Sequence, residues 1–146
     1  MNVPKHALNP GPDTAAVLAH MSMLQATISR LASNSASCKT WCSGLVVALW
    51  SLSAVKAPQL LPLSIVPVLA LGFLDAAYLA QERKFRAHFE AIAAKVRDRS
   101  YEHGDLFTVG EPVSRAMLAR ATLSWSILPY YGGVAVACVW AWRTVA

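Results

Sequence analysis

Residues 60–80 read LLPLSIVPVLALGFLDAAYLA, an almost uninterrupted apolar run whose single charged residue is Asp75. A helix of about 21 residues with a rise of 1.5 Å per residue is roughly 30 Å long, which matches the hydrocarbon thickness of a bilayer. Pro62 and Pro67 lie in its first half and should bend or loosen that end, which membrane helices tolerate when neighbours satisfy the freed carbonyl groups. The run therefore predicts a transmembrane helix.

Two further apolar runs flank this one. Residues 41–57, WCSGLVVALWSLSAVKA, lie at the short end of the length range for a span. The link to residue 60 is so short that the two helices should be antiparallel. Residues 123–142, LSWSILPYYGGVAVACVWAW, carry aromatic residues at both ends, as helices that reach both lipid–water interfaces do. For this third run, a re-entrant or interfacial helix is the alternative.

The three runs together predict an all-α membrane protein. Its core would be an antiparallel transmembrane helical hairpin with cytoplasmic helical extensions, followed by a third, C-terminal transmembrane helix. The composition agrees, because only 14% of the 146 residues are charged, whereas soluble domains carry about 25%. The net charge of +5 resides in basic residues that flank the apolar runs, so we expect a lipid bilayer and no nucleic acid as the partner.

The distribution of basic residues predicts an orientation. Of the 13 Lys and Arg residues, only Lys56 and Arg143 lie on the far side of the predicted spans. Because positively charged flanks stay in the cytoplasm, the N-terminus and the segment between the second and third runs should be cytoplasmic. The C-terminus should then lie outside a bacterial inner membrane, or inside if the third run does not span.

The chain is expected to be organised in five parts. These are a disordered N-terminus (1–13), a cytoplasmic amphipathic helix (14–40), the transmembrane hairpin (41–80, with spans 41–57 and 60–80), a basic cytoplasmic helix and loop (81–120) and the third transmembrane helix (121–146). Within the fourth part, residues 100–111 are a loop by composition. Pro112 favours the first turn of a following helix, where its missing N–H costs nothing.

Apolar residues recur at helical spacing in two stretches outside the spans. They are Met21, Leu24, Ile28 and Leu31 in the first stretch, and Phe85, Phe89, Ile92 and Val96 in the second. Spacings of three and four residues match a coiled-coil seam, so the two stripes are expected to pack against each other or against another subunit. The run SNSAS at 33–37 could instead break the first helix, because Ser and Asn compete for backbone hydrogen bonds. Residues 14–32 would then lie on the membrane surface.

Asp75 is the most informative single residue, because a carboxylate inside a span is costly unless it is paired, protonated or hydrated. One interpretation is an ion or proton site, or a polar contact that fixes helix association. The other is a residue near the interface that is bonded to Trp41 or Lys39 on the neighbouring helix, or that reaches the lipid headgroups.

Small residues at four-residue spacing predict close helix packing. Gly72, Ala76 and Ala80 form one such series, and Gly44 and Ala48 form a shorter one. Small residues let membrane helices approach closely, either within the hairpin or between copies of the chain.

Basic residues also stand directly beside the membrane. They are Lys39, Arg83, Lys84 and Arg86. Their expected role is to set the topology and to contact anionic headgroups, with a nucleotide phosphate or an acidic partner protein as the alternative.

The residues give no support for an enzyme. The four histidines are scattered, no nucleophile–base constellation is recognisable from spacing, and no catalytic residue is predicted. Cys38 and Cys42 could hold a metal only with two more ligands, and Cys138 makes the cysteine count odd, which excludes a complete set of intramolecular disulfides. We expect no metal and no cofactor.

A resemblance rests on two stretches, LQATISRLASNSASCKTWCSGLVVAL entering the first span and FLDAAYLAQERKFRAHFEAIAAKVR leaving the second. They resemble a poorly characterised family of small bacterial multi-span membrane proteins, often found beside defence and mobile-element genes. The residues that match its pattern best are Asn34, Ser35, Lys39, Trp41, Asp75, Tyr78, Glu82, Arg83, Phe85 and Arg86. The resemblance implies a membrane-embedded helical hairpin and no particular chemistry.

Three functional hypotheses follow. The first is a small inner-membrane protein that acts by helix-mediated assembly, as a homo-oligomer or with a partner protein, for example as a membrane-perturbing effector in bacterial phage defence. The second is a small ion or proton channel, or a transporter subunit, that uses Asp75. The third is a membrane anchor or accessory subunit for a partner enzyme.

Overall fold

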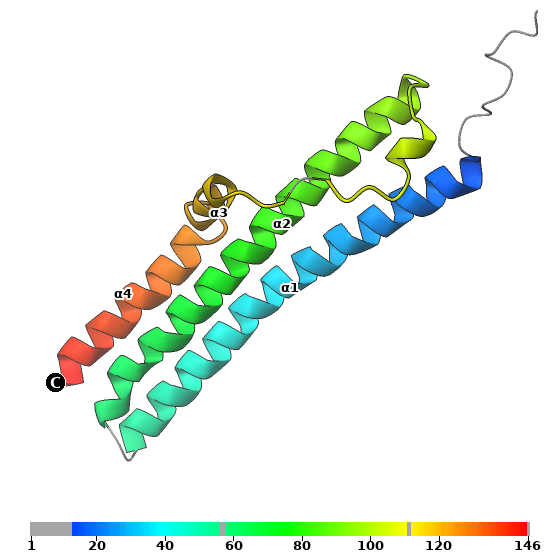
Figure 1. The fold of residues 1–146 in the computed structure, drawn as a ribbon. Coiled ribbons are helices and arrows are strands. Elements are labelled where there is room, and N and C mark those ends of the chain that lie inside the picture. Colours follow the sequence, from blue (N-terminus) through cyan, green and yellow to red (C-terminus); the bar gives the residue numbers. More distant parts are fainter. Residues whose placement is uncertain (1–12, 56–57, 111, 146) are drawn as a thin grey trace, which may run out of the picture. The chain divides into compact units, whose positions relative to one another are not determined.

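The computed structural model of the chain describes residues 13–55, 58–110 and 112–145 (Figure 1). In order, its elements are α1 (Thr14–Val55), the 3₁₀ helix η2 (Pro58–Ser64), α2 (Ile65–Arg97), the short 3₁₀ helix η3 (His103–Asp105), α3 (Arg115–Thr122) and α4 (Leu128–Val145). The described residues form helices, turns and bends and no strand, which confirms the all-helical class. The predicted disordered lead-in, residues 1–13, lies outside the described residues except for Asp13.

Helix α1 continues without a break through residues 33–37. The Ser37 hydroxyl donates to the carbonyl of Ser33 over 2.9 Å, and the Ser43 hydroxyl donates likewise to the carbonyl four residues earlier. These bonds satisfy the hydroxyl groups within the helix, so the side chains do not compete for its backbone hydrogen bonds. The alternative prediction, a break that frees residues 14–32, is therefore wrong.

The start of the second apolar run is not α-helical. Residues Pro58–Ser64 form a 3₁₀ helix that contains Pro62, and α2 begins only at Ile65. Proline has no N–H to donate and its ring obstructs the preceding turn, so the tighter 3₁₀ form occupies this end. The prolines were expected to loosen the start of the predicted span 60–80, and this start is the separate 3₁₀ helix η2. The α-helical part of the span is therefore shorter than expected.

The chain divides into two compact units, described here one at a time. The polar unit comprises the described residues of 1–29 and 82–112, and the apolar unit those of 30–81 and 113–146. In the polar unit, Leu24 and Ile92 are buried, as the two apolar stripes require. Val96 is exposed in the last turn of α2, so it does not pack within this chain, and packing against another subunit stays a prediction for it.

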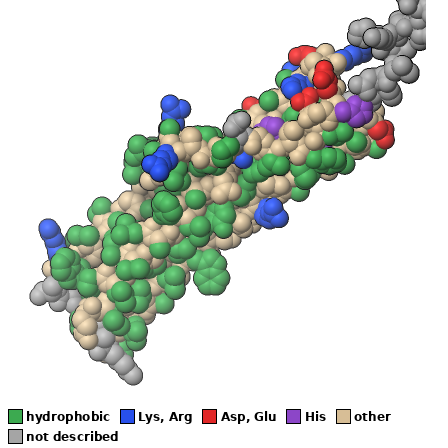
Figure 2. Space-filling view, viewed as in Figure 1, with side chains coloured by type: hydrophobic (Ala, Val, Ile, Leu, Met, Phe, Trp, Pro, Cys, Tyr) green, Lys and Arg blue, Asp and Glu red, His purple; other side chains and the backbone are tan. Residues whose placement is uncertain are grey.

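The core of the apolar unit combines small and large side chains from α1, α2 and α4 and from the turn that precedes α4. Its buried members are Cys42, Val46, Val68, Ala76, Ile127, Tyr131 and Cys138. Helix α4 also contacts η2. Hydrophobic side chains are spread over the visible face of this unit, with a few Lys and Arg side chains among them (Figure 2).

The C-terminal part differs from the single continuous helix predicted from residue 123. Ser114 caps α3, accepting a hydrogen bond from the backbone N–H of Met117 at 3.2 Å, so the helix starts after Ser114 and not at Pro112. Residues 123–127 then form turns and a bend, and α4 begins at Leu128. A Ser hydroxyl is a better helix cap than a proline, which explains the shifted start of α3.

Two helical segments of the described chain are long and apolar enough to cross a membrane, Thr14–Val55 and Pro58–Arg97. The 18 residues of α4 are not among them. At 1.5 Å per residue, α4 is about 27 Å long, close to the minimum for a span.

Candidate functional site

The carboxylate of Asp75 is buried between α1 and α2. Its side chain is 0% exposed, and its Oδ2 atom lies 2.5 Å from the Lys39 ammonium. Ser35, one helical turn before Lys39 on α1, donates its hydroxyl to Oδ1. Residues four apart lie on one helix face, so α1 presents both donors to the same carboxylate. Of the alternatives predicted for Asp75, the geometry matches a polar contact to Lys39.

The two partners of this ion pair differ in their access to the surface. The Lys39 side chain is 24% exposed, whereas that of Asp75 is fully enclosed. A buried carboxylate is tolerated only when it is paired and hydrogen-bonded, and Asp75 meets both conditions. Trp41, the other predicted partner, is exposed and makes no hydrogen bond to Asp75 among the described residues. Lys39 therefore has a structural role, as the partner of Asp75, in addition to the juxtamembrane role that was predicted for it.

Tyr130 ties the first turn of α4 to α1 next to this ion pair. Its hydroxyl donates to the Lys39 carbonyl at 2.7 Å and lies 2.5 Å from the Ser43 hydroxyl. The neighbouring Tyr131 ring meets Tyr130 edge-on, with ring centroids 4.9 Å apart. Sequence patterns had indicated only an interfacial role for these tyrosines, because the hydrogen bond of Tyr130 joins residues 91 positions apart.

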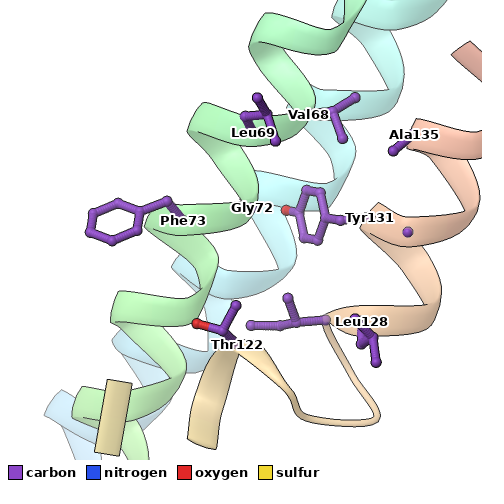
Figure 3. A pocket seen from close by; sticks show the side chains of 10 residues that line it. Val68, Leu69, Gly72, Phe73, Thr122, Leu128, Tyr131 and Ala135 are labelled. Atoms are coloured by element: carbon purple, nitrogen blue, oxygen red, sulfur yellow. The ribbon is translucent and has the colours of Figure 1, made fainter. Parts of the chain in front are cut away.

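An apolar cavity of about 310 Å³ lies between α2 and α4 (Figure 3). Its lining residues are Val68, Leu69, Gly72, Phe73, Thr122, Ile127, Leu128, Tyr131, Gly132 and Ala135. The Tyr131 ring lies beside Gly72, where an added Cβ would be 3.2 Å from Cδ1 of the ring. Gly72 is therefore small because the ring packs directly on the α2 backbone.

The predicted small-residue positions fall into two classes. Gly72, Ala76 and Ala80 are buried in the apolar unit. Gly44 and Ala48 are exposed, and nothing lies within 4 Å of a Cβ added at Gly44. The expectation that Gly44 and Ala48 pack within the chain is corrected, because this face of α1 points away from its neighbours.

A second polar cluster, in the polar unit, surrounds the fully buried His20. Its Nδ1 atom lies 2.8 Å from the Tyr101 hydroxyl and its Nε2 atom 3.2 Å from the Thr108 carbonyl. The Nε2 atom of His88 lies 3.0 Å from the same carbonyl. Because a carbonyl only accepts, both Nε2 atoms must donate, and the Tyr101 hydroxyl bonds to the other nitrogen of His20, Nδ1.

The loop between α2 and α3 contributes Tyr101 and Thr108 to this cluster and is also held by an ion pair to α2. Lys95 pairs with Asp105 at 2.5 Å, and the backbone N–H of Glu102 also donates to Asp105. The hydrogen bond from Lys95, followed by that from Glu102, lowers the pKa of the Asp105 carboxyl. Burial raises the pKa of the Tyr101 phenol. The loop is thus fastened at several points, although its composition predicted only a loop.

Gly110 permits the close approach of this loop to His88. Its φ angle is +70°, and an added Cβ would lie 3.2 Å from the His88 Nδ1 atom. The scattered histidines carried no sequence signal for this cluster, since His20 and Thr108 are 88 positions apart.

The remaining predicted positions lie as follows. In the stripes, Leu24, Leu31 and Ile92 are buried, Met21, Ile28, Phe85 and Phe89 are half-buried, and Val96 is exposed. In the basic run, Arg83 is exposed, Lys84 lies 4.9 Å from the Phe85 ring centroid, and Arg86 pairs with Glu82 at 2.7 Å. An i,i+4 pair of this kind stabilises the helix surface modestly.

The chemistry of the two clusters is that of polar anchoring within the fold. Among the described residues, no three His, Cys, Asp or Glu side chains converge as a metal site would require. Comparison with known proteins gives no match to a family model, to a curated protein or to a solved structure. The resemblance to a family of small membrane proteins therefore stays a prediction.

Proposed function

We propose that this chain is a small integral membrane protein whose apolar unit lies in the bilayer. The observation that carries the proposal is the outer surface of that unit, where large apolar side chains face outward on α1, α2 and α4. They include Leu45, Val47, Leu52, Val66, Leu69, Phe73, Val136 and Trp140. Such a continuous apolar surface needs lipid or a protein partner to cover it.

The order of contacts supports an antiparallel hairpin of α1 with η2 and α2. Ser35 and Lys39 bond to Asp75, whereas Trp50, further along α1, donates to Ser64, earlier in the chain than Asp75. With α4 as a third, short span, the basic flanks would place the N-terminus in the cytoplasm. The single carboxylate of the unit is enclosed and paired, as expected of a charge at membrane depth.

The hairpin acts by assembly, with copies of itself or with another membrane helix. Gly44 and Ala48 support this role, because they are exposed and lie one turn apart on one face of α1. In a bilayer the hydrophobic effect does not drive helices together, so association depends on close packing, which small residues permit.

The test is the mass of the particle in nanodiscs, measured by native mass spectrometry. Ala48→Leu should shift the wild-type oligomer toward monomer. Ala54→Leu is the matched control, because Ala54 is also exposed on α1 but lies about 120° around the helix from Ala48. A wild-type chain that is monomeric at all concentrations would contradict assembly with itself. A chain released from membranes by alkaline carbonate would contradict integration.

A second candidate function is ion or proton movement that involves Asp75. The observation in its favour is the partly exposed Lys39 ammonium, which links the enclosed carboxylate to the surface. Liposomes carrying the wild type should then show a flux that Asp75→Asn abolishes at equal insertion. Absence of flux in the wild type would exclude this candidate.

A further inference from the structure

The cavity between α2 and α4 opens to the outside of the apolar unit. Leu69, Phe73 and Leu128 line it and are themselves exposed, so its mouth is rimmed by apolar side chains. One further lining residue, Thr122, is the last residue of α3. On the proposed function, on which this inference rests, the mouth faces lipid hydrocarbon and α3 marks one end of the cavity.

The charges of the apolar unit are of one sign at its surface. Within residues 30–81 and 113–146, which form this unit, Asp75 is the only Asp or Glu, and its side chain is buried. Helix α3 carries Arg115 and Arg120, both exposed, within its eight residues. A surface with exposed cations and no exposed carboxylate is complementary to anionic headgroups.

The segment between α3 and α4 places this cationic helix near a lipid–water interface. Trp125, in the turns that follow α3, is 91% exposed, and Leu123 beside it is also exposed. An indole with an apolar body and a polar N–H is typical of that interface. The cavity therefore extends from the interfacial level of α3 into the depth at which α2 and α4 pack.

We infer that the cavity holds one acyl chain of a glycerophospholipid with a net-negative headgroup, and that the exposed arginines of α3 attract this headgroup electrostatically. The volume of about 310 Å³ suits this occupant, since it is at the lower end of ligand-pocket sizes of about 300–1,000 Å³. The exposed arginines of α3 favour an anionic lipid over a second copy, whose surface is equally cationic. An acyl chain supplies dispersion contacts to walls that otherwise border a void.

Charge, and not the apolar contact, sets the selectivity of this site. All lipid chains are equally apolar, so the cavity by itself does not distinguish one phospholipid from another. A basic residue near an anionic membrane surface favours binding by about fivefold. Loss of Arg115 and Arg120 together should therefore lower the preference for anionic lipid by more than tenfold.

The experiment is native mass spectrometry of the full chain from nanodiscs made of equal parts phosphatidylglycerol and phosphatidylcholine. We expect one retained phosphatidylglycerol for each chain. Arg115→Gln combined with Arg120→Gln should remove the preference, while Arg143→Gln, an exposed cation in the last turn of α4, should not. Both sets of variants alter exposed residues, so folding is not at stake.

Two adjacent glycines test the cavity itself. Gly132 lines it and Gly133 does not, and a Cβ at either position meets nothing within 4 Å. Gly132→Leu should place its side chain in the cavity and abolish lipid retention, whereas Gly133→Leu should retain the lipid. The smaller Gly132→Ala should give an intermediate loss, which supports the inference even if the leucine variant fails to fold.

Three results would overturn the inference. They are equal retention of both lipids by the wild type, full retention by Gly132→Leu, and a dimer without lipid that Gly132→Leu dissociates. Failure of the proposed function is distinguished by carbonate extraction, because a chain that stays in the membrane but retains no phosphatidylglycerol refutes the lipid site alone.

Discussion

Removal of Lys39 is the sharpest test of the apolar unit. The substitution Lys39→Met keeps the length and apolar stem of the side chain and removes its charge. It leaves the Asp75 carboxylate, which is 0% exposed, with the Ser35 hydroxyl as its remaining hydrogen-bond partner among the described residues. The opposite substitution, Asp75→Asn, leaves an ammonium that is already 24% exposed and can turn toward water.

The two variants should therefore differ in stability. Loss of one partner of a buried ion pair costs about 3–5 kcal/mol when the remaining charge stays enclosed, and we expect Lys39→Met to reach about 3 kcal/mol. Asp75→Asn keeps an oxygen acceptor for Ser35 and should cost about 1.5 kcal/mol, the lower end of the range for a lost hydrogen bond to a charged group. The double variant leaves no enclosed charge and should be no less stable than Asp75→Asn.

The assay is unfolding in mixed micelles, titrated with sodium dodecyl sulfate and followed by tryptophan fluorescence. Arg83→Met is the control, because Arg83 is exposed on α2, and its loss should change the free energy of unfolding by less than about 0.5 kcal/mol. The reasoning is refuted if Lys39→Met costs no more than this control, or if Asp75→Asn costs more than Lys39→Met.

Further predictions concern the loop and the glycines. His20→Ala should expose the loop after α2 to proteases, because it removes two hydrogen bonds to that loop, and limited proteolysis that leaves the loop intact would contradict this. The Lys95 hydrogen bond lowers the pKa of Asp105 in the folded state. The Lys95–Asp105 pair therefore stabilises the loop above the unfolded-state pKa of about 3.9, and this stabilisation is lost as the pH falls through the folded-state pKa. The protection factors of the loop amides, which are exchange rates corrected for the intrinsic effect of pH, should fall on that acidification in the wild type, and this dependence should be weaker in Lys95→Gln. Gly72→Val should lower the free energy of unfolding by about 1–3 kcal/mol through overpacking, whereas Gly44→Val should leave unfolding of the single chain unchanged. The assay is thermal unfolding. Equal effects of the two variants would refute the assigned packing.

Local patterns determined the class of this protein and the position of its most unusual residue. The apolar runs predict helices and the face that each one buries, because burial of a helix depends on residues three and four apart. Asp75 stood out because a carboxylate in an apolar run needs a partner, and Lys39 was one of the partners that the sequence offered. Gly72, Ala76 and Ala80 were recognisable for the same local reason.

Some positions with the same local pattern have different surroundings in the structure. Gly44 and Ala48 share the spacing of the series at Gly72, yet they are exposed and Gly72 meets Tyr131. Periodicity assigns a residue to a helix face but does not say which neighbour, if any, covers that face. The start of α4 was misplaced for a related reason, since the residues after Leu123 are apolar enough for a helix but form turns.

Only the tertiary structure decided the polar contacts between distant segments. The sequence offered scattered histidines and serines, and the fold joins His20 to Thr108 across 88 positions and Ser35 to Asp75 across 40. Such pairs depend on how packed helices and a closed loop set side chains in space, and no residue spacing encodes that separation. The sequence by itself determined which segments are apolar and favour helices. Only the tertiary structure decided which polar groups meet, through the packing of the helices and the position of the loop between α2 and α3. The packing of α4 also left the cavity between α2 and α4.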